Sequence, residues 1–270
     1  MFLNRVKTAV LLAGLSGLLL LLGNMIGGGR GIFAAFIISM MMNFLTYFFA
    51  DKIVLSMYGA QPMDKDRFAN IYEMVDELAG NAGIPMPKLW IIPTDMANAF
   101  ATGRNPQHAS VAVTRGILDV LSESELRGVL AHELAHVKNR DILIATIAAT
   151  VATAIGYLSN MLQWAFIFGG RDERGRSSGF GALIAAIIMP MAAMLIQMAI
   201  SRSREYMADE AGAKISNDPL ALASALEKLG GKARTDHVES ESTAHTSTAS
   251  LFIVNPFSGG SFVNLFSTHP

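Results

Sequence analysis

The sequence predicts a mainly α-helical membrane protein in which two pairs of apolar helices alternate with two polar segments of mixed α and β structure. Three observations support this fold class. Hydrophobic residues make up 51% of the 270 residues and charged residues only 16%. The mean hydropathy of +0.38 exceeds that of most soluble domains. Four stretches without a charged residue reach the roughly 20 residues that a helix needs to cross the core of a bilayer.

The first two apolar stretches, residues 8–29 and 31–50, are predicted to form a helical hairpin. Arg5 and Lys7 precede the first stretch, as basic residues precede a cleaved signal peptide. The length of this stretch and the second apolar run close behind it favour a retained hairpin instead. Residues 1–50 are therefore expected to be a transmembrane hairpin.

Residues 51–141 are predicted to form the first half of a polar domain. Residues 64–82 have apolar residues at the three-and-four spacing of an amphipathic helix. Ser122 is followed three residues later by Glu125, which is the capping-box pattern at the start of a helix. Short apolar or alternating runs, separated by proline and glycine, predict a small sheet; they are residues 88–92, 97–102 and 110–114.

The third and fourth apolar stretches, residues 142–170 and 177–201, are predicted to form a second transmembrane hairpin. Pro190 lies in the fourth stretch and should kink a helix there, which is tolerated in membranes when neighbouring groups satisfy the freed carbonyl. Residues 202–270 are expected to complete the polar domain. Within them, residues 230–250 are rich in serine, threonine, alanine and charge, a composition typical of a flexible loop.

Positive charges predict the orientation in the membrane. If every apolar stretch crosses, the basic residues next to the stretches fall on one side, which the positive-inside preference identifies as the cytoplasm. Three arginines in the loop 169–178 oppose this orientation. The sequence thus predicts a multi-pass protein of the cell inner (plasma) membrane whose polar domain is cytosolic. The charges on the cytoplasmic side are Arg5, Lys7, Lys52, Lys138, Arg140, Arg202 and Arg204.

The pentapeptide His132-Glu-Leu-Ala-His136 indicates a metal site. Residues four apart on a helix lie within about 40° of each other, so both imidazoles can bind one ion. Glu133 would stand beside the zinc-bound water, which is the arrangement that hydrolyses a peptide bond. The sequence contains no cysteine, so further ligands must be histidine, aspartate or glutamate.

Glu205 is predicted to be the third zinc ligand. An extended zincin pattern would require a histidine at position 142, which is isoleucine here. Glu205 and Asp209 follow the fourth apolar stretch and share a helical face. Two intervening spans return the chain to the side that carries His132. Asp209 could accept the free ring N–H of a ligand histidine; the alternative is that both acids lie on a solvated helix face.

Four motifs in a fixed order resemble the HtpX family of integral-membrane zinc metallopeptidases, over nearly the whole chain. This resemblance implies a zincin-type metalloprotease domain that holds one Zn²⁺ per chain through His132, His136 and Glu205, with Glu133 as the catalytic base. It also implies proteolytic quality control of membrane proteins, often under stress. Members of the family usually continue with a basic helix after the last of these motifs, which here ends at Pro270. The motifs are Asn98-Ala-Phe-Ala-Thr-Gly, Ala131-His-Glu-Leu-Ala-His, Arg204-Glu-Tyr-Met-Ala-Asp and Ser267-Thr-His-Pro.

The resemblance also suggests how substrate is bound. Asn98, Ala99 and Phe100 resemble the family's edge strand, to which an extended substrate can add through main-chain hydrogen bonds. His269 is a candidate partner for the oxyanion, although it could equally be an exposed terminal histidine. Phe100 could instead be a core aromatic. The other histidines, at positions 108, 237 and 245, lie in polar sequence and are expected to be exposed.

The expected function is that of a membrane-bound zinc endopeptidase acting on unfolded or membrane proteins. A net charge of −1 gives no basic footprint for nucleic acid. One alternative is an intramembrane zinc protease, which the charges around the motif disfavour because they are costly at membrane depth. The other is a non-enzymatic membrane scaffold that carries the motif by chance.

Overall fold

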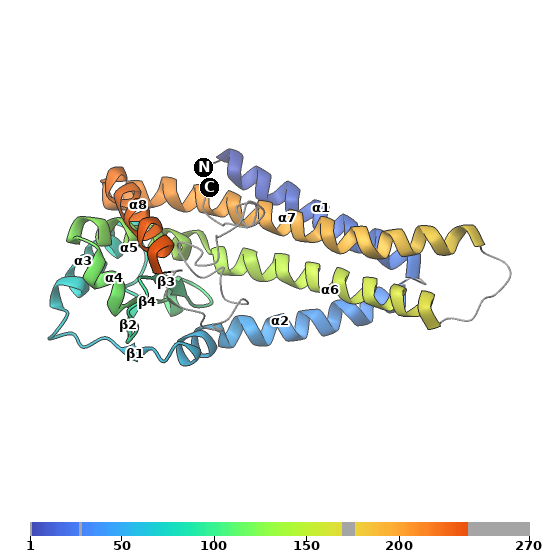
Figure 1. The fold of residues 1–270 in the computed structure, drawn as a ribbon, viewed down its shortest axis with the longest axis horizontal. Helices are drawn as coiled ribbons and strands as arrows, with labels where there is room; N and C mark the ends of the chain where they lie inside the picture. Colours follow the sequence, from blue (N-terminus) through green and yellow to red (C-terminus); the bar gives the residue numbers. More distant parts are fainter. Residues whose placement is uncertain (1, 27–28, 169–175, 237–270) are drawn as a thin grey trace. The chain divides into compact units, whose positions relative to one another are not determined.

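The computed structural model describes residues 2–26, 29–168 and 176–236, which form helices and one small sheet (Figure 1). The chain divides into two compact units. The apolar unit consists of Phe2–Tyr47 and Ile144–Ser203, and the polar unit contains Phe48–Leu143 together with residues 204–236. The sequence-based prediction of a mainly helical protein with a small sheet is confirmed.

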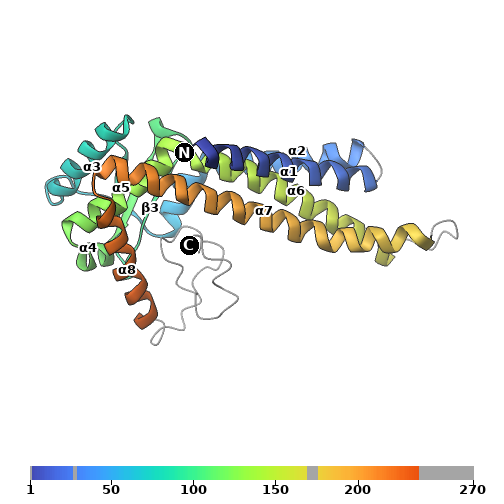
Figure 2. The same cartoon turned by 90° about the horizontal axis from the view of Figure 1, so that it is seen from above.

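Among the described residues, four helices contribute to the apolar unit. They are α1 (Phe2–Ile26), most of α2 (Gly29–Met57), most of α6 (Asp141–Phe168) and the first part of α7 (Arg176–Ser216). The helices α1, α6 and α7 run alongside one another (Figures 1 and 2). They share a buried cluster that includes Leu15, Leu22, Ile155 and Leu158.

Large apolar side chains also cover the outside of this unit. Trp164 is 63% exposed and Leu195 is 62% exposed, an arrangement that suits contact with lipid and not with water. Among the described residues, two helical segments are long and apolar enough to cross a membrane, Asp141–Trp164 and Leu183–Ser216. A shorter apolar helical segment covers Val6–Leu19.

Pro190 lies inside α7 without ending it. Because proline has no N–H, the carbonyl of Ala186, four residues earlier, loses its donor within the helix. The side chain of Gln163 on α6 supplies a replacement, since its Nε2 donates to Ala186 O at 3.1 Å. A neighbouring helix thus satisfies the polar group that the proline frees, as an apolar environment requires.

The polar unit contains a mixed four-stranded sheet among the described residues. Its strands are β1 (Gln61–Pro62), β2 (Lys88–Ile92), β3 (Ala99–Thr102) and β4 (Ser110–Thr114), in the order β1-β2-β4-β3. The strands β2 and β4 are parallel, whereas β1 pairs antiparallel with β2 and β3 pairs antiparallel with β4. The bounds of β2 and β4 match the predicted runs, β3 begins two residues later than expected, and β1 was not predicted.

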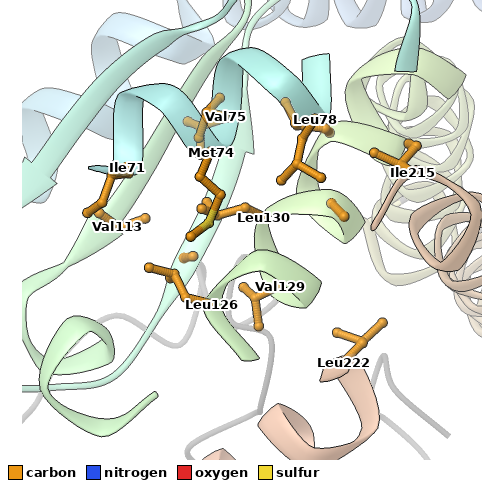
Figure 3. Close-up of a cluster of buried hydrophobic side chains, with 14 of the residues drawn as sticks. Ile71, Met74, Val75, Leu78, Val113, Leu126, Val129, Leu130, Ile215 and Leu222 are labelled. Atoms are coloured by element: carbon orange, nitrogen blue, oxygen red, sulfur yellow. The ribbon is translucent and has the colours of Figure 1, made fainter. Parts of the chain in front are cut away.

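The helix α5 (Glu123–Asn139) forms the centre of the polar unit. It packs against α3 (Ala69–Ala82) on one side and α8 (Pro219–Asp236) on the other (Figure 3). Gly128 permits the approach of α8, since a Cβ there would lie 2.6 Å from Leu222 N. Short helical segments at Arg115–Val120 (α4) and Pro106–His108 (η1) complete the unit. The core side chains include Ile71, Met74, Val75, Leu78, Val113, Leu126, Val129, Leu130, Ile215 and Leu222.

Capping groups fix both ends of α5. Ser122 and Glu125 form the predicted capping box at its start. Glu125 is buried and also accepts hydrogen bonds from Lys228 Nζ at 2.7 Å and Ser224 Oγ at 2.6 Å, both on α8. At the other end, Arg140 adopts a left-handed conformation with φ of 56°, and α6 begins at the next residue.

The contacts of Glu125 predict a loss of stability in acid. The hydrogen bond from Lys228, followed by those from Ser224 and Ser122, lowers the pKa of Glu125 from 4.5 to about 2. A lowered pKa in the folded state stabilises the fold above the unfolded-state pKa and ceases to do so as the pH falls through the folded-state value. We expect Glu125→Gln to reduce the Tm by a few degrees at pH 7, and the difference to shrink between pH 4.5 and pH 2. Circular dichroism of the detergent-solubilised protein would measure this.

The control for this experiment is Glu227→Gln, at an exposed position on α8 next to Lys228, which should leave the Tm nearly unchanged. A Tm loss for Glu125→Gln that is as large at pH 2 as at pH 7 would contradict the linkage.

The hydrogen bond across Pro190 predicts a second effect. Replacing Gln163 by leucine leaves the Ala186 carbonyl without its donor, so we expect a loss of about 0.6–1.7 kcal/mol in the free energy of unfolding. In a Pro190→Ala background the helix regains its own N–H donor, and Gln163→Leu should cost less. Unfolding in mixed micelles would measure the loss of unfolding free energy in both backgrounds. An equal loss in the two would show that Gln163 does not replace the donor that Pro190 removes.

Candidate metal centre

Two elements of the polar unit bring together three side chains that could bind a metal ion. The helix α5 carries His132 and His136, whose Nε2 atoms lie 3.1 Å apart. The C-terminal part of α7 carries Glu205, whose Oε2 lies 3.4 Å from Nε2 of His132 and 3.6 Å from Nε2 of His136. Among the described residues, these three form the group of side chains that could hold a metal ion.

The spacing of the three ligand atoms fits zinc. With bonds of about 2.0–2.2 Å, a tetrahedral zinc ion holds its ligand atoms roughly 3.3 Å apart. The three measured separations lie on either side of that value. Two imidazole nitrogens and one carboxylate oxygen are ligands that zinc accepts, and such a set leaves a fourth position for water or substrate.

A glycine allows α7 to approach α5 this closely. A Cβ at Gly212 would lie 3.0 Å from the Cα of His132 and 3.1 Å from its backbone nitrogen. Any side chain at position 212 would therefore press on the backbone of a ligand residue. Gly212 could not be predicted from the sequence, because a single glycine in a helix has no local pattern that reveals its contact.

Each histidine also contacts a carboxylate through its other ring nitrogen. Nδ1 of His132 lies 3.0 Å from Asp209 Oδ1, and Nδ1 of His136 lies 2.7 Å from Asp141 Oδ2. A carboxylate at Nδ1 holds the proton there and leaves Nε2 free to bind a metal. Asp209 was predicted for such a role from sequence, whereas Asp141 was not.

Arg204 is buried in the polar unit, with 6% of its surface exposed. Its guanidinium forms an ion pair with Asp141 and donates to the backbone carbonyl of Asn139 at 3.2 Å. The residue directly before Glu205 is thus part of the interior of the polar unit.

Glu133 points toward β3. It is 6% exposed, and the backbone N–H of Ala101 donates to its Oε2 at 2.8 Å. Burial raises the pKa of Glu133, against the opposing effect of the two imidazoles and the Ala101 N–H. A carboxylate with a raised pKa is a stronger proton acceptor, which suits a general base.

Of the residues predicted to bind substrate, Ala99 and Phe100 lie in β3 and Asn98 directly precedes it. Asn98, Ala99 and Phe100 are all buried. Phe100 packs in a cluster with Leu55, Ile92 and Ala112, so its side chain belongs to the core. Among the described strands, β3 is the last on its side of the sheet, and the backbone of Ala101, which the sequence analysis did not single out, faces Glu133.

The remaining predicted residues lie elsewhere. His108 is exposed, and its ring nitrogens lie 2.8 Å from Asn105 Oδ1 and 3.0 Å from an Arg104 nitrogen. His237, His245 and His269 lie outside the described residues. Of the expected loop at 230–250, residues 230–236 form the end of α8, and the others also lie outside the described part.

Comparisons with known proteins agree with this geometry. The model of peptidase family M48 matches residues 65–270. The chain is 54% identical to a protease HtpX homolog from Desulforapulum autotrophicum, over 99% of this chain and 86% of that protein. It is 52% identical to a protease HtpX homolog from Syntrophobacter fumaroxidans, over 99% of this chain and 95% of that protein.

A solved structure shares the fold. The crystal structure of S. mikatae Ste24p aligns with a TM-score of 0.54 at 18% identity, over 86% of this chain and 58% of that one. At this identity the likeness concerns the fold alone.

The close contact at Gly212 predicts a mutational effect on metal binding. Gly212→Ala adds a Cβ 3.0 Å from the Cα of His132, so we expect a loss of about 1–3 kcal/mol in stability from overpacking and a lower zinc content per chain. The matched control is Gly80→Ala on α3, where a Cβ meets nothing within 4 Å. Metal analysis and thermal unfolding would measure both variants. A normal zinc content and a normal Tm in Gly212→Ala would show that neither metal binding nor stability depends on the close approach of α7 to α5.

Proposed function

The chain belongs to peptidase family M48, and from this membership we propose that it is a membrane-bound, zinc-dependent endopeptidase that degrades damaged or misfolded membrane proteins. The observation that carries this proposal is the convergence of His132, His136 and Glu205 beside the buried Glu133. Membership in a peptidase family argues against a non-enzymatic scaffold.

The residues of the site divide the chemistry among them. His132, His136 and Glu205 would hold one zinc ion per chain. When bound, zinc supplies a Lewis acid that polarises the scissile carbonyl and makes water acidic enough to act as a nucleophile near neutral pH. Glu133 takes the proton of the attacking water and passes it to the leaving amine. The Ala101 N–H, 2.8 Å from Glu133, keeps this carboxylate in place for both transfers.

We further propose that substrates bind as an added strand at the outer edge of β3. Support comes from the position of β3 beside Glu133 and from its lack of a further partner strand among the described residues. The predicted pairing through Asn98 is not available, because its N–H donates to Thr114 Oγ1 at 2.8 Å and its carbonyl accepts the Thr114 N–H at 2.9 Å. Main-chain pairing along β3, beginning at Ala99, would recognise an extended backbone with little regard to side chains. Unfolded segments are therefore the expected substrates. His269 remains the proposed partner for the oxyanion.

The proposed location is the inner (plasma) membrane, with the active site facing the cytoplasm. The two candidate spans in α6 and α7, together with the helical conformation of α1 and α2, support a protein that crosses the membrane four times. Exposed basic residues near these helices, such as Lys138 and Arg140, support the cytoplasmic side and argue against an intramembrane active site.

Casein cleavage by the purified protein in detergent with zinc tests this function. Glu133→Gln should keep one zinc ion per chain and lower the rate by at least about 100-fold, because general acid–base catalysis contributes that much or more. Glu205→Ala should lose most of its zinc. The control is Glu210→Gln on the same helix, which breaks a surface ion pair with Lys214. Equal rates for Glu133→Gln and the wild type would refute the assigned base.

A further inference from the structure

The corner between α5 and α6 lies directly beside the candidate metal centre. The helix α5 ends at Asn139, Arg140 adopts the left-handed conformation, and α6 starts at Asp141. This turn brings Asp141 back against the last turn of α5. Its Oδ2 lies 2.7 Å from Nδ1 of His136, so the carboxylate is placed to accept the ring N–H.

Arg204 joins this corner to α7. Its guanidinium pairs with Asp141, donates to the carbonyl of Asn139 at 3.2 Å and contacts the sulfur of Met207 at 3.4 Å. The Asn139 carbonyl belongs to the last turn of α5, where carbonyls have no partner within the helix. Arg204 therefore compensates the charge of Asp141 and caps α5 with one planar group.

The position of Arg204 in the sequence links these contacts to the third ligand. Glu205 is the next residue on the same helix, and its Oε2 lies 3.6 Å from Nε2 of His136. A guanidinium held at two points by the corner of α5 and α6 fixes the register of α7 at this position. The Arg204 guanidinium thus influences both ring nitrogens of His136: it holds Asp141, which faces Nδ1, and it places Glu205, which faces Nε2.

We propose that Asp141 and Arg204 are positioning residues of the metal centre, which orient the ring of His136 and hold Glu205 within reach of it, and thereby raise the affinity for zinc. This inference rests on the proposed zinc-dependent function. Neither residue belongs to the group of side chains that could hold the metal. They act through the ligands, as carboxylates behind ligand histidines do in zinc sites generally.

The two histidines differ in the surroundings of their carboxylates. The side chain of Asp141 is 10% exposed, whereas that of Asp209, behind His132, is 36% exposed. A hydrogen bond to a charged group is stronger where water is excluded. Asp141 should therefore contribute more to zinc affinity than Asp209 does.

The test measures the zinc dissociation constant of the full chain in detergent, by competition with a chromophoric chelator. We expect Asp141→Asn and Arg204→Met each to raise this constant about 10–100-fold, and Asp209→Asn to raise it less. The effects of Asp141→Asn and Arg204→Met should not add in the double variant, because the two residues act as one unit. The control is Lys214→Met, which removes an exposed ion pair on the same helix and should leave the constant unchanged.

A second readout separates positioning from folding. The double variant Asp141→Asn with Arg204→Met leaves no unpaired charge in the interior, and it should stay folded by circular dichroism while its Co²⁺-substituted form shows an altered visible absorption spectrum. Folded variants with wild-type zinc affinity and a wild-type Co²⁺ spectrum would overturn the inference. Failure of all three variants to fold would assign the pair to the fold alone and would overturn it as well.

These outcomes are distinct from those that test the proposed function. A wild-type protein that binds zinc but does not cleave casein would refute the endopeptidase, while the affinity measurements could still support the role of Asp141 and Arg204. Conversely, wild-type zinc affinity in Asp141→Asn would refute the positioning role and leave the effect of Glu133→Gln untouched.

Discussion

The candidate site depends on the packing of α7 against α5 at contact distance. Two imidazoles on one helix can occupy only two positions around a metal ion, and the third ligand must come from elsewhere in the chain. Here it comes from a helix that begins at Arg176, well beyond the histidine motif in sequence. Gly212 lets the two backbones meet, and the packing of α5 between α3 and α8 keeps the imidazoles from moving away.

The site concentrates buried polar groups, and each of the central ones has a partner. Burying a charge is costly unless opposite charges or hydrogen bonds compensate it. Glu133 accepts a backbone N–H, the two histidines face carboxylates, and Arg204 pairs with Asp141. Such a network specifies one arrangement of side chains, because moving any member leaves another without its partner.

Local patterns in the sequence predicted the helices and strands, but they did not predict contacts between residues far apart in the chain. The capping box at Ser122, the runs of β2 and β4, and the spacing of His132 and His136 are relations between residues near each other in the chain, and the structure has them. The family and the peptidase class were also predicted correctly from ordered motifs. Asp141, Arg204 and Gly212 acquire their roles only through contacts between separate helices. Arg204 in particular looked like a surface charge, because its burial depends on a partner more than 60 positions away.

The contact between Ala101 and Glu133 shows why some determinants of a site leave no trace in a sequence. The donor is a main-chain amide, which nineteen of the twenty amino acids would provide equally well, and only proline would remove it. The placement of Glu133 is therefore insensitive to the chemical identity of residue 101. It is governed by the path of the backbone. The contact can therefore be kept while the residue at position 101 changes.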